Sequence, residues 1–383
     1  MKIVVLHTAD ALEEPDPVLD QLSAALRELG HESEQLAVDA DVDPVIATLR
    51  RIEPDLIFNI AELYRYDSDK AFLAKMWPHV LGAFEYMEKL RLSERTEANR
   101  AINPAFYGLM PVSISHEGYS AKPVHSYWDD FWALRGYDDA VELARALGRP
   151  AAAHRSAASR DAFRADLQAS ILAAVHEHRI DFIPGAAELG DFDATSTTIA
   201  LSPGGAQAWL PPALLRRTFE RYWQGFVARR DGDKPWDDHT PYEWRNVAAF
   251  VRLGWRQRVP ALLDFFMADR RPAGWNQWAE VVGRDAREPR FVGDMPHAWI
   301  ASDFLRSLYD LFAWERRSDQ ALVLADGMPV DWLRGEGIGI EHLRTPYGEL
   351  SYRLREHDGR LELSLPAGNA MPPGGLVLRW PYA

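Results

Sequence analysis

Residues 69–92 read DKAFLAKMWPHVLGAFEYMEKLRL and form the longest amphipathic stretch of the chain. Apolar side chains recur in it every three or four residues, which is the period of an α-helix with one buried face. The same period predicts seven more helices: Trp128–Leu134, Asp138–Leu147, Ser159–His178, Pro212–Arg229, Pro241–Leu253, Val259–Asp269 and Pro296–Arg316. The sequence therefore predicts a mainly α fold.

The two ends of the chain follow other patterns. Residues 1–60 alternate strands and helices, which predicts a parallel sheet. The strands are Lys2–His7, Glu32–Val38 and Asp55–Asn59, and the helices are Pro17–Leu29 and Pro44–Arg51. After Gln320 the pattern changes to short alternating strands: Ala321–Leu324, Leu350–Arg355, Leu361–Leu365 and Leu376–Arg379. We expect three domains: α/β over 1–61, helical over 62–318 and a β cap over 319–383.

The composition excludes several classes of function. The chain has 383 residues, a formal net charge of -14 and no cysteine. Disulfides, thiol catalysis and cysteine-ligated metals are excluded, and an acidic chain is a poor match for nucleic acid or an anionic membrane. Neither a secretory signal nor an apolar run long enough to cross a membrane is recognisable. A cytoplasmic protein with no nucleic-acid or membrane partner is the expectation.

Three short stretches combine tryptophan and other aromatic residues with carboxylates: His125–Trp132, Glu188–Asp193 and Gly274–Glu280. Aromatic rings stack on the apolar faces of sugars, and acids bind hydroxyls or move protons at a glycosidic bond. These stretches predict a carbohydrate-binding cleft.

The first segment resembles the N-terminal domain of D-alanine–D-alanine ligases of the ATP-grasp group. The resemblance is carried by Lys2–Leu6, Leu26–Glu32 and Pro54–Glu62, and it covers about 60 residues. No glycine-rich phosphate loop with a nucleotide-binding lysine follows, so an ATP-grasp ligase relic is the weakest functional alternative.

From about Ala61 onward, the chain resembles the catalytic region of (α/α)6 six-hairpin glycosidases. The carrying stretches are Tyr66–Trp77, Gly108–Arg135, Ile183–Leu201 and Pro272–Trp314. The resemblance implies an incomplete (α/α)6 toroid, because fewer than twelve helices are predicted. It also implies hydrolysis of a glycosidic bond with inversion and without a cofactor.

The resemblance to trehalase-like and processing-glucosidase-like enzymes makes Asp191 the expected general acid. Glu188 and Asp193, in the same Glu188–Asp193 stretch, are alternatives for that role. A competing interpretation is a solvated loop whose acids cap a helix near Thr195, since aspartate is a favoured helix N-cap.

Glu280 is the expected catalytic base, because it precedes a long helix as the base does in related toroid enzymes. Trp275 and Trp278 are expected to bind sugar beside it. The alternative is a glutamate that packs beside core tryptophans.

Further sugar contacts are expected from Tyr127, Trp128, Asp130, Glu188 and Asp193, and from His297 if that side chain reaches the cleft. Aromatics at helical spacing are more often core residues, which is the alternative for Trp132. The His116–Glu117 pair lacks a second histidine at ligand spacing, so no metal site is expected.

One further function is an alternative to a hydrolase. A toroid without its first hairpins would expose apolar helix faces, to be covered by the N-terminal segment or by a second copy of the chain. A non-catalytic carbohydrate-binding or interaction module, including a homo-oligomer, is therefore the main alternative to a hydrolase.

Overall fold

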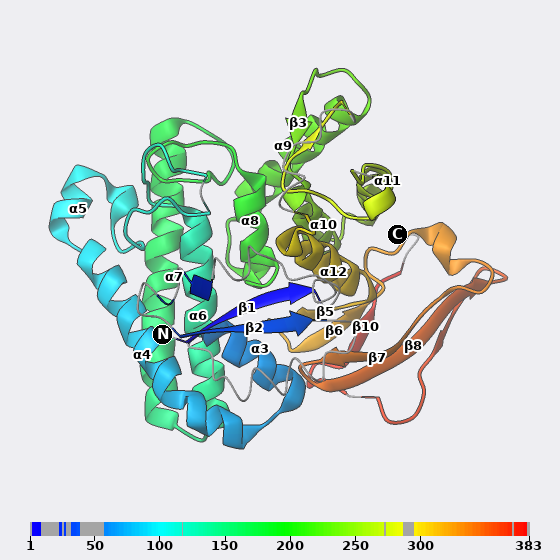
Figure 1. Cartoon of the computed structure of the whole chain (residues 1–383), viewed down its shortest axis with the longest axis horizontal. Coiled ribbons are helices and arrows are strands. Elements are labelled where there is room, and N and C mark those ends of the chain that lie inside the picture. The colour runs from blue at the N-terminus through cyan, green and yellow to red at the C-terminus, as the bar shows by residue number, and fades with distance from the viewer. Residues whose placement is uncertain are drawn as a thin grey trace. The chain divides into compact units, whose positions relative to one another are not determined.

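The structure is a computed structural model that describes residues 2–8, 23–24, 27, 32–38, 57–116, 118–271, 273–285, 295–369 and 371–380. These residues form ten α-helices and four small sheets, which confirms the mainly α class (Figure 1). None of the helices within these ranges is both long and apolar enough to cross a membrane. The chain divides into two compact units: Met1–Leu90 with Leu134–Ala162, and Arg91–Ala133 with Phe163–Ala383.

The first unit begins with a parallel pair of strands. Strands β1 (Lys2–Thr8) and β2 (Glu32–Val38) pair along their whole lengths, as the sequence predicts. The described residues of the predicted helix Pro17–Leu29 are helical, and the predicted helix Pro44–Arg51 lies outside the described residues.

The predicted third strand, Asp55–Asn59, is wrong. Helix α3 (Ile57–Asp67) begins inside it. The side chains of Ile60 and Leu63, one turn apart, are both buried, so the apolar period continues as a helix. A short apolar run does not by itself distinguish a buried strand from a helical turn.

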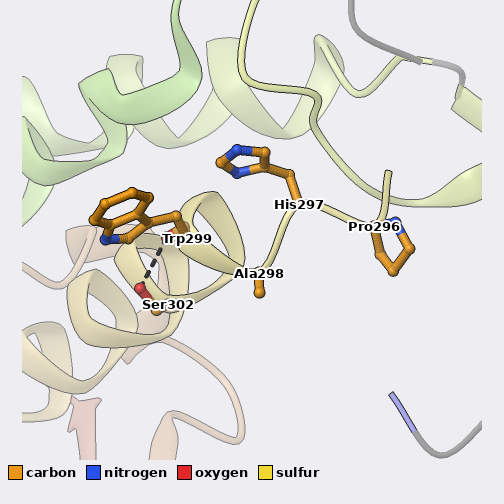
Figure 2. Close-up of a pocket in the computed structure, with 5 residues that line it drawn as sticks. All are labelled: Pro296, His297, Ala298, Trp299 and Ser302. Atoms are coloured by element: carbon orange, nitrogen blue, oxygen red, sulfur yellow. Dashed lines mark hydrogen bonds between the residues drawn. The ribbon is translucent and has the colours of Figure 1, made fainter. Parts of the chain in front are cut away.

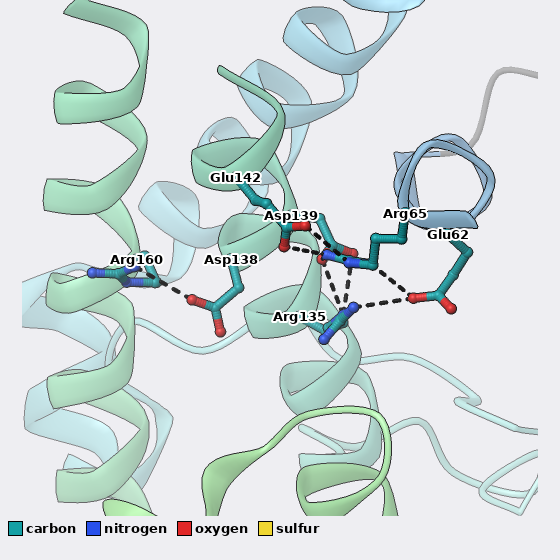
Figure 3. Close-up of polar contacts among 7 residues, drawn as sticks. All are labelled: Glu62, Arg65, Arg135, Asp138, Asp139, Glu142 and Arg160. Atoms are coloured by element: carbon teal, nitrogen blue, oxygen red, sulfur yellow. Dashed lines mark hydrogen bonds and ion pairs between the residues drawn. The ribbon is translucent and has the colours of Figure 1, made fainter. Parts of the chain in front are cut away.

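A buried network of ion pairs joins α3 to α6 (Tyr127–Ala146) (Figure 3). The Arg65 guanidinium lies 2.7 Å from Glu62 and 2.6 Å from Glu142, and it also pairs with Asp139. Arg135 pairs with Glu62 at 3.1 Å and with Asp139 at 3.0 Å. The two arginine side chains are only 5% and 3% exposed, so the acids around them are essential counterions.

Three long helices follow the predicted pattern with different boundaries. The expected helix over residues 69–92 is α4 (Lys70–Glu94). The two short helices expected within residues 128–147 are a single helix, α6, with Gly136 in its interior. A β-carbon on Gly136 would lie 3.2 Å from the Met87 methyl group, so close packing accounts for this glycine. Helix α7 (Pro150–His178) begins at a proline, nine residues before its predicted start, Ser159.

The helices of the second unit are mostly as expected. Four correspond to predicted helices: α9 (Pro212–Arg230), α10 (Arg245–Leu253), α11 (Val259–Ala268) and α12 (Ala298–Phe312). Helix α8 (Ala194–Leu201) is the helix near Thr195 of the alternative interpretation, and α5 (Glu97–Ile102) is absent from the prediction. The predicted helix Pro296–Arg316 is too long, because its last residues form strand β5 (Ala313–Arg316). Strand β5 pairs with β6 (Ala321–Leu324), and hydrogen bonding to a sheet replaces helical bonding there.

The remaining strands complete the small sheets. The two-residue strands β3 (Asp238–His239) and β4 (Val282–Gly283) pair with each other, and β10 (Leu376–Leu378) is parallel to β6. Strands β7 (Ile338–Thr345), β8 (Gly348–His357) and β9 (Arg360–Ser364) form a meander; β7 is absent from the prediction. The turn between β8 and β9 has Asp358 and Gly359 at its centre, with φ of 51° and 71°, as a type I′ turn requires.

Two ion pairs link helix α10 to helix α12. Arg245 donates to Asp303 at 2.7 Å, and Arg252, seven residues further on, donates to Asp310 at 2.6 Å. Burial raises the pKa of the Asp303 carboxyl to about 6, although Arg245 opposes this rise. The unfolded value is about 3.9, so Asp303 contributes stability that is present below that pH and is lost as pH rises through its folded pKa.

We expect Asp303→Asn to remove this dependence. The difference in free energy of unfolding between wild type and variant should fall by about 2–3 kcal/mol as pH rises from about 4 to about 7. Urea unfolding at several pH values measures it. A difference that does not change with pH would contradict the assignment.

Candidate functional site

Two of the three aromatic and acidic stretches lie side by side in the second unit. Ser126 forms a β-bridge with Ala186. Beside it, the Tyr127 amide donates to the Gly185 carbonyl and the Ala187 amide donates to the His125 carbonyl, both at 3.0 Å. The start of α6 is therefore bonded to the loop that carries residues 188–193.

This loop folds back on itself around Asp191. The Gly185 amide donates to the Asp191 carbonyl, and the Ala186 amide donates to Asp191 Oδ1, both at 3.0 Å. The turn needs Gly190, whose φ is +60° and whose missing β-carbon would lie 2.4 Å from the His178 ring. A glycine within a run of acids is what allows this sharp turn.

The second carboxylate oxygen of Asp191 accepts a hydrogen bond from a tyrosine. The Tyr119 hydroxyl donates to Asp191 Oδ2 at 2.9 Å. A β-carbon at Gly185 would lie 2.6 Å from that hydroxyl, 2.9 Å from Asp191 Oδ2 and 2.9 Å from the Asp193 β-carbon. Only glycine at position 185 lets these three groups approach so closely.

Asp193 has a structural function, and it also lies beside the residues that pack at Gly185. Its carboxylate accepts from the Thr195 amide at 2.9 Å and from the Ser196 amide at 3.2 Å, which caps α8. The cap agrees with the alternative interpretation of the loop. Asp193 Oδ2 also lies 3.8 Å from His116 Nε2, and the side chain remains 20% exposed.

A third aspartate, Asp129, comes from the first turn of α6. Ser115 donates to Asp129 Oδ1 at 2.9 Å, and Ser113 donates to Oδ2. Ser115 Oγ is also 3.1 Å from His116 Nδ1 and 2.9 Å from Ser126 Oγ. Serine hydroxyls therefore orient both the carboxylate and the histidine.

Aromatic rings lie against these carboxylates. The Trp128 and His116 ring centroids are 5.4 Å apart with planes inclined by 32°, and Tyr119 meets His116 edge-on at 6.0 Å. Trp132 lies edge-on to Trp128 at 5.8 Å. All four rings are half-buried, so each keeps some accessible surface. We call His116, Tyr119, Trp128, Asp129, Asp191 and Asp193 the acidic-aromatic cluster.

The electrostatics of the cluster are negative. Burial raises the pKa of the Tyr119 hydroxyl, and the charges of Asp191, Asp193 and Asp129 raise it further. The Tyr119 hydroxyl therefore keeps its proton and stays neutral at physiological pH. All three aspartates lie close enough to the Tyr119 hydroxyl for their charges to raise its pKa.

Glu188 lies on the same loop as Asp191, and it forms a separate pair with His125. Its carboxylate lies 2.6 Å from His125 Nδ1 and also accepts from the His125 amide. Burial alone would raise the pKa of Glu188, but the hydrogen bond and charge of His125 lower it on balance. Phe106 stacks on the His125 ring at 4.7 Å. Glu188 thus holds His125 in place, in contrast to the expected contact with sugar.

Two expected sugar ligands on α6 are core residues. Tyr127 is fully buried, with its hydroxyl 2.8 Å from Ser170 Oγ. Asp130 is also fully buried, and its Oδ1 accepts from the Met110 amide at 2.8 Å. Burial raises the pKa of Asp130 well above its usual value, and the charges of Asp129 and Glu188 add to this. Both residues face inward because α6 packs this face against the unit.

The third stretch has a different setting. Trp278 is 4% exposed, and its indole N–H donates to the Phe266 carbonyl at 2.8 Å. It packs between Trp244 and Phe304, so the expected sugar contact is replaced by a core position. Trp275 is 54% exposed, and Glu280 is half-buried. Within the described ranges, no hydrogen bond or ion pair links Glu280 to the acidic-aromatic cluster.

His297 lies at the beginning of α12. Its Nδ1 accepts from the Ile300 amide at 3.3 Å and caps the helix. The ring also lines a surface pocket of about 430 Å³ with Pro296, Ala298, Trp299 and Ser302 (Figure 2). His297 therefore caps the helix, and its side chain is accessible from the pocket as well.

His116 and Tyr119 are site residues that the sequence does not predict. The available signal was a histidine and a tyrosine a few residues before Trp128 and Asp129, which lie in the first turn of a helix. Among the residues that the structure describes, no three histidine or acidic side chains are arranged so that they could hold a metal ion. No protein-family model matches the chain, and no curated protein matches it.

Proposed function

We propose that the acidic-aromatic cluster binds a carbohydrate. One observation carries the proposal: a group of half-buried rings lies in contact with carboxylates. The His116 ring packs against Tyr119 and Trp128. Tyr119 donates to Asp191, and His116 lies 3.8 Å from Asp193. Rings offer flat apolar faces to the C–H surface of a sugar, and carboxylate oxygens accept from its hydroxyls. The sequence prediction of a sugar site rests on the same pairing of side chains.

We further propose that the bound sugar is a glycoside that is cleaved with inversion. Asp191 is the proposed acid, because a proton on Oδ2 is accommodated when the Tyr119 hydroxyl turns to accept instead of donate. Glu280 is the proposed base. Inversion requires the two carboxyl groups to lie about 6.5–9.5 Å apart with water between them.

A binding module without catalysis is the second candidate. Asp193 is committed to capping α8, and Asp129 is held by two serines. These contacts support a rigid, preorganised binding surface whether or not a bond is broken. Sugar binding without hydrolysis by the wild-type protein would favour this candidate.

The binding site is tested with Trp128→Ala. Loss of the stacking ring should weaken binding of a linear oligosaccharide by about tenfold or more, measured by titration calorimetry against a panel of neutral trisaccharides. Trp332→Ala is the control, because Trp332 is 49% exposed on a short turn outside the cluster. Equal affinities for the wild type and Trp128→Ala would refute the site. Protection by ATP against thermal unfolding would instead revive the ligase alternative.

A further inference from the structure

The carboxylates of the acidic-aromatic cluster are bonded to neutral donors. Asp191 accepts from a backbone amide and a tyrosine, Asp129 from two serines, and Asp193 from amides and hydroxyls at the start of α8. Within the described part of the chain, no lysine or arginine forms an ion pair with any of the three. His116, at 3.8 Å from Asp193, is the nearest group that can carry positive charge.

Other carboxylates of the second unit form ion pairs with arginine. Asp166 pairs with Arg91 and Arg95, Glu243 with Arg229, and Asp310 with Arg252. These acids meet guanidinium groups at 2.6 to 3.1 Å. The acids of the cluster therefore differ from these three acids, whose charges are compensated by arginine.

A buried carboxyl next to the cluster adds an independent observation. Asp130 has no exposed surface, and its Oδ2 has no hydrogen-bond partner among the described residues. It follows Asp129 directly in the chain, and it lies close enough to Asp129 and Glu188 to be influenced by both charges. Asp130 faces the core, so the carboxylates that a ligand would meet are those of Asp129, Asp191 and Asp193.

We infer that the cluster selects a positively charged amino sugar over a neutral sugar and rejects an anionic one. Three carboxylates would attract an ammonium group, and the faces of Trp128 and Tyr119 would stabilise it by cation–π contact. A uronate or a sugar phosphate would meet the same charges as repulsion. This inference rests on the proposed carbohydrate site and names its substrate class.

Three trisaccharides of equal length test the inference: a β-1,4-glucosamine trimer, neutral cellotriose and anionic trigalacturonate. At about 0.02 M salt and weakly acidic pH, the glucosamine trimer should bind about tenfold tighter than cellotriose, and trigalacturonate should be weakest. At about 0.5 M salt the preference should shrink to about threefold or less, because ions screen exposed charges.

Asp129→Asn keeps a hydrogen-bond acceptor and removes one charge. It should lose more affinity for the glucosamine trimer than for cellotriose, by about three- to tenfold. Asp331→Asn is the matched control; this acid is 81% exposed beside Arg334, and the substitution should change neither affinity.

The outcomes separate the two proposals. Cellotriose binding as tightly as the glucosamine trimer, or trigalacturonate binding best, overturns the charge selection and leaves the carbohydrate site standing. Failure of all three sugars to bind overturns the charge selection and also counts against the site itself.

Discussion

Replacing Asp191 with asparagine should lower the rate of glycoside hydrolysis by about 10²–10⁴-fold, because the amide cannot donate a proton to the leaving oxygen as an acid. The fold should be preserved. The asparagine oxygen can still accept from the Ala186 amide, and its NH₂ group can donate to Tyr119 when that hydroxyl turns. A change confined to turnover, with binding of a neutral sugar retained, is the expected result.

The measurement uses any oligosaccharide or chromogenic glycoside that the wild-type protein cleaves. Glu280→Gln should give a loss of similar size if Glu280 activates the water. Asp181→Asn is the control, since Asp181 is 65% exposed and pairs only with exposed Arg217 among described residues. Wild-type turnover in both Asp191→Asn and Glu280→Gln would show that the catalytic pair is wrongly assigned.

Replacing Arg65 with alanine should lower the free energy of unfolding by about 3–5 kcal/mol. The Asp139 side chain is fully buried, and removing Arg65 leaves it with Arg135 as its remaining described counterion. Glu62 and Glu142 lose the same partner (Figure 3). Breaking a buried ion network costs more than the pair itself contributes, because the remaining charges stay desolvated.

Urea unfolding followed by circular dichroism measures this change. Arg155→Ala is the matched control in the same unit, because Arg155 and Glu85 form an exposed pair at 3.1 Å with side chains 53% and 56% accessible. Its cost should be below about 1 kcal/mol. A loss for Arg65→Ala no larger than that of the control would mean that the buried network does not hold α3 to α6.

Local features of the candidate site were predictable from sequence. Glycine within a run of acids predicted the turn at Gly190, and aspartate before an apolar helix start predicted the cap at α8. These are short-range effects, because they depend on φ angles and on amides only a few residues away.

Membership of the site was not predictable in the same way. Trp128 and Tyr127 are neighbours on one helix, yet Trp128 keeps exposed surface and Tyr127 is fully buried. Trp278 and Trp275 differ in the same sense. Composition marks all four as aromatic residues near acids, and only the packing of other elements decides which ring remains accessible.

The sequence by itself determined that the protein is mainly helical, and it identified the stretches in which aromatic residues meet acids, because helical period and residue chemistry are local properties. Tertiary structure alone decided that Ile57–Asp67 is a helix bound through Arg65 to α6. It also brought Tyr119 to Asp191, 72 residues apart in the chain. Contacts at such separations depend on how buried faces and charges are satisfied together, which no single stretch of sequence encodes.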